Sequence, residues 1–410
     1  MESMHNDHSH ICFKENWRIS NDFWFKLGQC EAIIQAISFT AIRPDYRKKL
    51  HKIALIKGAQ ATTAIEGNTL SFEEIEEIQN GGVLPPSREY LQKEVENILN
   101  GFNAILEEIL LNEKILFITG DLIRRFHLIV GDGLGEMFKA QPGKFRKTNV
   151  IVGRYRAPNF QDVPNLVKNL CDWLYTQLHF ERGQSFAETI IEAIISHIYI
   201  TWIHPFSDGN GRTARLIEYY LLLRAGVPDI ASHVLSNFYN LTRSEYYRRI
   251  EVATERKDIT PFLEYAIQGF LDGLIEVLQL IQENQLLITW RNYIYGIFDN
   301  LSQQKNEEVA KRRRNLILRL PPDKSVTLDE ILELHPSIFK NYQEASDRTF
   351  IRDIEELQKL ELLKKEKNEY KANIETLGGY GSLSPKRRNI CRCPHCSPGN
   401  TRNLVKKLPA

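Results

Sequence analysis

One twelve-residue stretch, residues 204–215, carries the residue types that an anion-binding site needs, and it reads HPFSDGNGRTAR. Its centre is the run Gly209-Asn210-Gly211. These residues tolerate positive φ, so consecutive backbone N–H groups can line a concave nest. A helix is expected to begin after the nest, at Arg212, and the N-terminus of a helix favours a bound anion. The spacing therefore predicts a phosphate-binding turn.

Four charged or titratable side chains flank this turn. Arg212 and Arg215 lie three positions apart, so on a helix both point to one side and can reach the same polyphosphate. Asp208 adjoins the nest, where a carboxylate commonly holds Mg²⁺ against phosphate oxygens. His204 can act as a general base near neutral pH. Glycines alone would indicate only a structural turn, but the full combination favours phosphate chemistry.

The stretch resembles the signature of the Fic-domain family, His-x-Phe-x-(Asp/Glu)-Gly-Asn-Gly-Arg-x-x-Arg, and matches it at every fixed position. The resemblance extends over roughly residues 45–265. Pro142–Arg146 and Val150–Gly153 resemble the family's flap hairpin. Tyr246-Tyr247 resembles a tyrosine pair that contacts adenine in relatives, whereas Thr254 stands where some relatives carry an Asn.

The resemblance implies transfer of AMP from ATP, with Mg²⁺, to a Ser, Thr or Tyr hydroxyl of a protein. His204 would take the proton from the attacking hydroxyl, and Asp208 would hold the metal. Gly209, Asn210, Gly211 and Arg212 would bind the phosphates, and Arg215 would hold the γ-phosphate.

The flap resemblance adds a protein partner. The hairpin, including Val150 and Ile151, would pair with an extended segment of the target by strand addition.

A second motif lies near the end of a helix expected at 46–66. The run TTAIEG, residues 62–67, matches the family's inhibitory motif Ser/Thr-x-x-x-Glu-Gly/Asn and places Thr62 and Glu66 on one helix face. The resemblance implies that Glu66 pairs with Arg215, competes with the γ-phosphate and leaves ATP in an unproductive pose. The alternative is an ordinary helix end with Glu66 in solvent.

Composition narrows the class of protein. The 410 residues hold 53 Lys plus Arg and 52 Asp plus Glu, a formal charge of +1, which argues against a protein that coats nucleic acid or membrane. The apolar run 190–203 is too short for a membrane span and contains Glu192 and His197. Six Cys make no disulfide framework, and residues 1–11 do not resemble a secretory signal, so a reduced, cytoplasmic protein is expected.

Helical patterns dominate, and we expect a mainly α fold: a Fic-type helical core with a small β-hairpin flap and a C-terminal winged-helix domain. The expected regions are an N-terminal helical region with the inhibitory helix (1–115), a catalytic core (116–285), a linker helix with the winged helix (286–375) and a basic, disordered tail (376–410). The third helix of the winged-helix region mixes Arg348, Arg352 and Lys359 with several acidic residues, which leaves DNA binding and protein or dimer contacts equally open.

Other interpretations remain. Cys391, Cys393 and Cys396 are soft ligands, but their compact spacing favours a bare thiol cluster over zinc. The same motifs would suit removal of AMP from a protein, another Fic-type phosphotransfer, or a DNA-binding regulator that senses nucleotide. A homo-oligomer stays open.

Overall fold

The computed structural model describes residues 8–111, 117–178, 186–302, 307–343 and 347–378. The chain divides into two compact units, Met1–Gln282 and Glu283–Ala410. The first unit contains both regions that the sequence predicts as an N-terminal part and a catalytic core. Cys391, Cys393, Cys396 and almost all of the expected basic tail lie outside the described residues.

The described part is mainly helical, as the sequence predicts. The helices that begin in the first unit are α1 (Asn21–Phe39), α2 (Pro44–Ala64), α3 (Phe72–Gln79), α4 (Glu89–Leu106), α5 (Gly120–Gly131), α6 (Val163–Gln177), α7 (Phe186–Ile203), α8 (Asn210–Arg224), α9 (Val234–Leu241), α10 (Arg243–Arg256) and α11 (Thr260–Ser302), and the last of these continues into the second unit.

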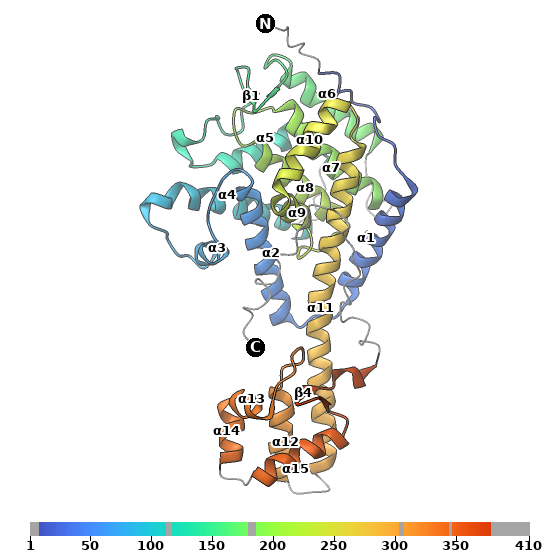
Figure 1. Cartoon of the computed structure of the whole chain (residues 1–410). Coiled ribbons are helices and arrows are strands. Elements are labelled where there is room, and N and C mark those ends of the chain that lie inside the picture. The colour runs from blue at the N-terminus through green and yellow to red at the C-terminus, as the bar shows by residue number, and fades with distance from the viewer. Residues whose placement is uncertain (1–7, 112–116, 179–185, 303–306, 344–346, 379–410) are drawn as a thin grey trace. The chain divides into compact units, whose positions relative to one another are not determined.

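Helices α7 and α8 form the centre of the first unit (Figure 1). Almost every residue of α7 from Thr189 onward is buried. By length and composition alone, α7 is apolar enough to cross a membrane, but 78% of it is buried within the protein, as in a core helix. Helix α8 packs against α2, α4, α5 and α7, so its N-terminus is held by elements far apart in the sequence.

Local sequence signals explain where several helices begin. Ser71 and Glu74 form a capping box at α3, and the Thr119 side chain accepts the Leu122 N–H at the start of α5. A two-stranded hairpin, β1 (Ile151–Val152) and β2 (Tyr155–Arg156), lies between α5 and α6. The expected hairpin is therefore present, with its turn at residues 153–154.

The second unit adds α12 (Glu307–Arg319), α13 (Leu328–Glu333), α14 (Pro336–Gln343) and α15 (Asp347–Lys359), followed by the antiparallel strands β3 (Leu363–Glu366) and β4 (Glu369–Ala372). The sequence predicts this order apart from α14. Asp353 of α15 is fully buried, where Arg312, Arg313 and the Tyr342 hydroxyl all donate to it. This acid therefore belongs to the core of the unit and not to its surface.

Candidate active site

The turn before α8 is shorter than the sequence predicts: among residues 209–211 only Gly209 has a positive φ, and the helix begins at Asn210 and not at Arg212. Gly209 has φ 77° and precedes the first residue of α8. A Cβ at this position would lie 2.9 Å from the Phe138 ring, so space as well as backbone conformation requires glycine. The Asn210 side chain closes the turn, because its amide donates to the Phe206 carbonyl and its oxygen accepts the Phe206 N–H, each at 2.9 Å. The backbone N–H groups at the start of α8 are thereby held in place.

His204 follows the last residue of α7 and is half-buried, with φ 48°. Its Nδ1 lies 3.4 Å from the Thr201 carbonyl oxygen, and a carbonyl only accepts, so Nδ1 carries the proton and Nε2 keeps its lone pair. Burial lowers the pKa of His204 to about 4. At neutral pH the ring is therefore uncharged and able to accept a proton at Nε2.

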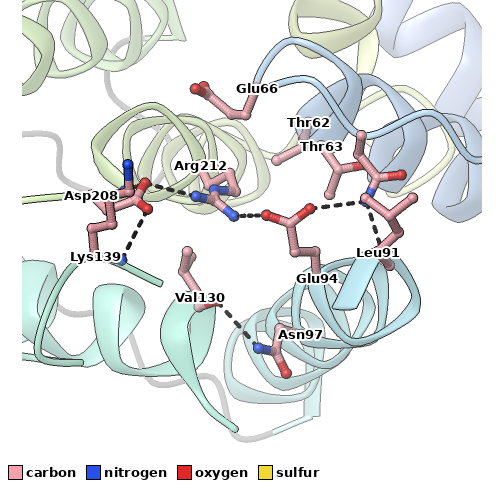
Figure 2. Close-up of polar contacts among 12 residues, drawn as sticks. Thr62, Thr63, Glu66, Leu91, Glu94, Asn97, Val130, Lys139, Asp208 and Arg212 are labelled. Carbon is pink, nitrogen blue, oxygen red and sulfur yellow. Dashed lines mark hydrogen bonds and ion pairs between the residues drawn. The ribbon is translucent and has the colours of Figure 1, made fainter. Parts of the chain in front are cut away.

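Arg212 is surrounded by carboxylates (Figure 2). It is 4% exposed, its Nη2 lies 2.9 Å from Asp208 Oδ1, and its Nη1 donates to Glu94 of α4. The guanidinium also lies 5.5 Å from the centre of the Phe138 ring. Asp208 itself accepts the N–H groups of Gly209 and Lys139. The charge of this arginine is thus compensated from both sides.

Arg215 is 1% exposed and reaches the end of α2. Its Nη2 donates to Glu66 Oε1 at 2.5 Å and to the Thr62 carbonyl at 2.9 Å. Burial alone would raise the pKa of Glu66, but the charge and hydrogen bond of Arg215 hold this pKa below its ordinary value. Glu66 is therefore an anion at neutral pH.

The Glu66 carboxylate also lies against the backbone at the start of α8. A Cβ added to Gly211 would come within 2.1 Å of Glu66 Oε1. Two nitrogen atoms of the buried Arg215, Nε and Nη1, meet no acceptor among the described residues. A buried guanidinium ordinarily has acceptors for its donors, and phosphate oxygens would supply them. The residues present therefore fit a polyphosphate.

The residues expected in the flap and beside adenine have other surroundings. Ile151 is 63% exposed, and the Val150 carbonyl accepts the Ala157 N–H beside the hairpin. Tyr246 lies in the core, where its hydroxyl is 2.9 Å from His197 Nε2. Tyr247 donates to the Ile65 carbonyl, next to Glu66.

Thr254 replaces an Asn of some relatives. Its hydroxyl oxygen accepts the Trp202 indole N–H at 2.8 Å, so in this chain it supports α7 from α10.

Two buried residues support the site that sequence analysis did not single out for this purpose. His127 of α5 accepts the Gly143 N–H at Nδ1 and donates from Nε2 to the Asp208 carbonyl, both at 2.9 Å, and its ring stacks on Phe206. Arg146 donates from Nε to the His204 carbonyl at 2.8 Å and from its main chain to Pro205. No local motif identifies His127, whereas Arg146 belongs to the flap segment.

Asp208 is the carboxylate that could hold a metal here. The described residues contain no group of three or more His, Cys, Asp or Glu side chains arranged to hold an ion by themselves. Mg²⁺ commonly uses one or two carboxylates together with substrate phosphates, so a single Asp beside an anion site fits that cation.

Part of this chain is similar to known proteins. Residues 117–222 match the family model described as Fic/DOC family. The chain is 33% identical over 207 residues to protein adenylyltransferase fic-1 of Caenorhabditis elegans, which covers 50% of this chain and 37% of that protein. It is 30% identical over 220 residues to protein adenylyltransferase Fic of Nematostella vectensis, covering 53% and 47%. The chain thus spans less than half the length of these curated relatives.

Two solved structures share the fold. A Fic family protein from Desulfovibrio desulfuricans superposes with a TM-score of 0.53 at 20% identity, covering 88% of this chain and 98% of that one. A fragment of Fic-1 from C. elegans superposes with a TM-score of 0.53 at 24% identity, covering 64% and 74%. At these identities the likeness concerns the fold alone.

Proposed function

The chain contains a Fic domain at residues 117–222, and from this premise we propose that it transfers AMP from ATP to a hydroxyl group of a protein and that Glu66 restrains the transfer. The observation that carries the proposal is the buried Arg215 of α8. It bonds to the Glu66 carboxylate, and its Nε and Nη1 have no acceptor in the described part of the chain. The Glu66 carboxylate is an anion, and it lies close to Gly211, where the turn and the N-terminus of α8 favour an anion.

The reaction follows from the geometry of His204. Nε2 removes the proton of the target hydroxyl, and the hydroxyl oxygen bonds to the α-phosphorus as the bond from that phosphorus to the bridging oxygen breaks, so that pyrophosphate leaves. Arg212, Arg215 and the amides at the start of α8 bind the polyphosphate and stabilise the charge that moves onto it. Mg²⁺, held through Asp208, would neutralise part of the same charge.

The hairpin is proposed to present the target. Ile151 and Val152 are 63% and 45% exposed, and β1 pairs with β2 alone among the described residues. A two-stranded hairpin offers backbone donors and acceptors along its outer edge, and an extended peptide can add there as a third strand. This mode places a hydroxyl through main-chain bonds and reads little sequence.

Glu66 is proposed as the brake. Its carboxylate uses the arginine that would hold the γ-phosphate, so ATP can bind fully only after the ion pair opens. Because 32% of the Glu66 side chain is exposed, the same carboxylate could hold a water molecule. Hydrolysis of AMP from a modified protein is therefore the second candidate function.

One experiment addresses both functions. Wild type, Glu66→Gly and the matched control Glu73→Gln, an exposed acid seven positions along the chain, are incubated with Mg–ATP labelled at the α-phosphate and a cell lysate. We expect strong labelling with Glu66→Gly and weak labelling with the other two. Absence of labelling with Glu66→Gly would reject the transferase. Faster release of AMP by wild type than by Glu66→Gly from the labelled targets would establish the reverse reaction.

The second unit is proposed to be a winged-helix module, since α12, α13 and α15 precede the β3–β4 hairpin. The exposed face of α15 mixes Arg348 and Arg352 with Glu355, which suits a protein partner, such as a second copy of this chain, better than a phosphate backbone. A salt-dependent gel shift with duplex DNA would contradict the assignment of a protein partner. A dimer whose fraction rises with protein concentration in sedimentation would support it.

A further inference from the structure

Glu94 is a buried acid on α4. It lies between the phosphate-binding turn at residues 209–211 and the turn at residues 65–68, which carries Glu66. Glu94 is 7% exposed. One of its oxygens accepts from Arg212 Nη1 (Figure 2). The other accepts the Asn68 side-chain amide at 3.0 Å. This carboxylate belongs to neither motif that the sequence identifies.

Asn68 connects Glu94 to the turn that carries Glu66. It follows Glu66 by two residues, and its main-chain N–H donates to the Thr63 carbonyl at the end of α2. Its side-chain amide donates to the Leu91 carbonyl as well as to Glu94, and its side-chain oxygen accepts the Leu70 N–H, each at 3.0 Å. The turn that carries Glu66 is thereby bound to α4.

Helix α4 is itself fixed on the other side. Asn97, three positions after Glu94, donates to the carbonyls of Val130 and Asp132 at the end of α5, at 3.2 and 2.7 Å. Figure 2 shows the bond from Asn97 to Val130 on the same helix as Glu94. The position of Glu94 is therefore set by contacts at both ends and does not depend on Arg212 alone.

We propose that Glu94 is the positioning residue of Arg212, and that together with Asn68 it couples the Glu66 turn to the phosphate site. The inference rests on the proposed function in that Arg212 is taken to bind phosphate. Arg212 has two carboxylate partners, and only Asp208 is needed for a metal. Glu94 is the partner that can remain. Because it still neutralises the buried Arg212, Asp208 can break its bond to that arginine and bind the metal.

This role predicts a specific defect. In Glu94→Gln the side chain keeps its size, but Arg212 loses one anionic partner and should hold Asp208 more strongly. Mg²⁺ must then compete with the arginine for Asp208. A general loss of packing would lower stability without changing the Mg²⁺ dependence of nucleotide binding.

The test measures Mg–ATP binding by calorimetry at several Mg²⁺ concentrations, with all variants in the Glu66→Gly background. Glu94→Gln should weaken binding at least tenfold and raise the Mg²⁺ concentration needed for half-maximal binding. Glu94→Asp should recover part of the loss because it restores the charge. The control, Glu96→Gln on the same helix, contacts Gln92 and should leave binding unchanged.

Unaltered affinity and unaltered Mg²⁺ dependence in Glu94→Gln would overturn the inference. If Glu94→Gln does not fold, Asn68→Ala is tested in its place. This substitution removes the hydrogen bond to the second oxygen of Glu94 and should also weaken Mg–ATP binding. Unchanged binding would again overturn the inference. A Glu66→Gly protein that binds Mg–ATP in a Glu94-dependent way but labels no target would reject the proposed transfer alone. Labelling that is indifferent to Glu94→Gln would reject the role of Glu94 alone, and absence of Mg–ATP binding would reject both.

Discussion

Glu66 Oε1 lies 2.5 Å from Arg215 Nη2, although the two residues are 149 positions apart in the chain. The pair joins the turn that follows α2 to the second turn of α8. Arg215 is almost fully buried while Glu66 keeps part of its side chain in solvent, so the carboxylate is the partner that can move. Release of the proposed brake would therefore require displacement of the α2 end or of one side chain, and no rearrangement of the core.

Glu66→Gln separates charge from bulk. The amide has the size of the carboxylate, but it cannot neutralise Arg215, so it should give way to the γ-phosphate. We expect target labelling at least tenfold above wild type, about 1.4 kcal/mol, and approaching that of Glu66→Gly. Labelling that stays at the wild-type level while Glu66→Gly is active would show that bulk and not charge blocks the site.

His204→Ala, made in the Glu66→Gly background, removes the proposed base. Loss of a general base typically costs about 10²- to 10⁴-fold in rate, and we expect a loss in that range. Calorimetry should show Mg–ATP binding close to that of Glu66→Gly, because His204 donates nothing to the phosphates in the proposed mechanism. Transfer that persists at the parent rate would remove His204 from the reaction.

The pH dependence of transfer reports the environment of His204. Burial lowers the pKa of His204 to about 4, and the negative charge of Glu66 acts in the opposite direction, so Glu66→Gly should lower this pKa further. The neutral base then persists as pH falls, and single-turnover rates of Glu66→Gly should stay level from pH 7 to about 5. A fall in rate centred near 6.5, the value of an unperturbed histidine, would contradict the burial argument.

His127→Phe tests the support of the turn from α5. The new ring can keep the stack on Phe206, but the Gly143 N–H and the Asp208 carbonyl lose their partner. An unsatisfied buried polar group costs about 1–3 kcal/mol, so we expect a comparable loss in the free energy of unfolding and slower transfer. The control is Leu128→Ala, because Leu128 is 50% exposed on the same helix. Equal stability of the two variants would contradict a supporting role for His127.

Asp353 predicts an acid-sensitive second unit. Burial alone would raise the pKa of Asp353, but hydrogen bonds from Arg312 and Arg313 hold it below its ordinary value. The unfolded chain therefore binds this proton more readily, and the stabilisation that is present above about pH 4 should be lost as pH falls through the folded-state pKa.

Calorimetric unfolding of the full chain can follow this transition. Asp353→Asn should destabilise the second unit by about 3 kcal/mol at pH 7, because Arg312 loses its carboxylate while Arg313 keeps, among the described residues, only Glu356, 3.5 Å away. It should also remove most of the acid dependence. An unchanged pH profile in this variant would assign the acid sensitivity to other groups.

Part of the fold can be predicted because it depends on neighbours in the chain. Helix periodicity, the capping residues and the glycine turn at 209–211 act over a few residues, and the mainly α fold follows from them. The sequence pattern does not predict the short helix α14, which begins at Pro336, a residue type that is favoured at the first position of a helix. The sequence places part of the flap hairpin at Val150–Gly153, and the paired strands are found at residues 151–156, because Gly153 lies in the turn between them.

The order of residues from His204 to Arg215 already specifies a base, an acid, an amide-lined turn and two arginines, because a short loop and one helix turn suffice to bring them together. The spacing of these residues does not determine which distant residues they contact. Three contacts each join separate segments across 81 to 149 positions of chain: Glu66 with Arg215, Glu94 with Arg212, and His127 with the Asp208 carbonyl. No spacing rule reaches that far: only the packing of α2, α4 and α5 around α8 brings these groups together.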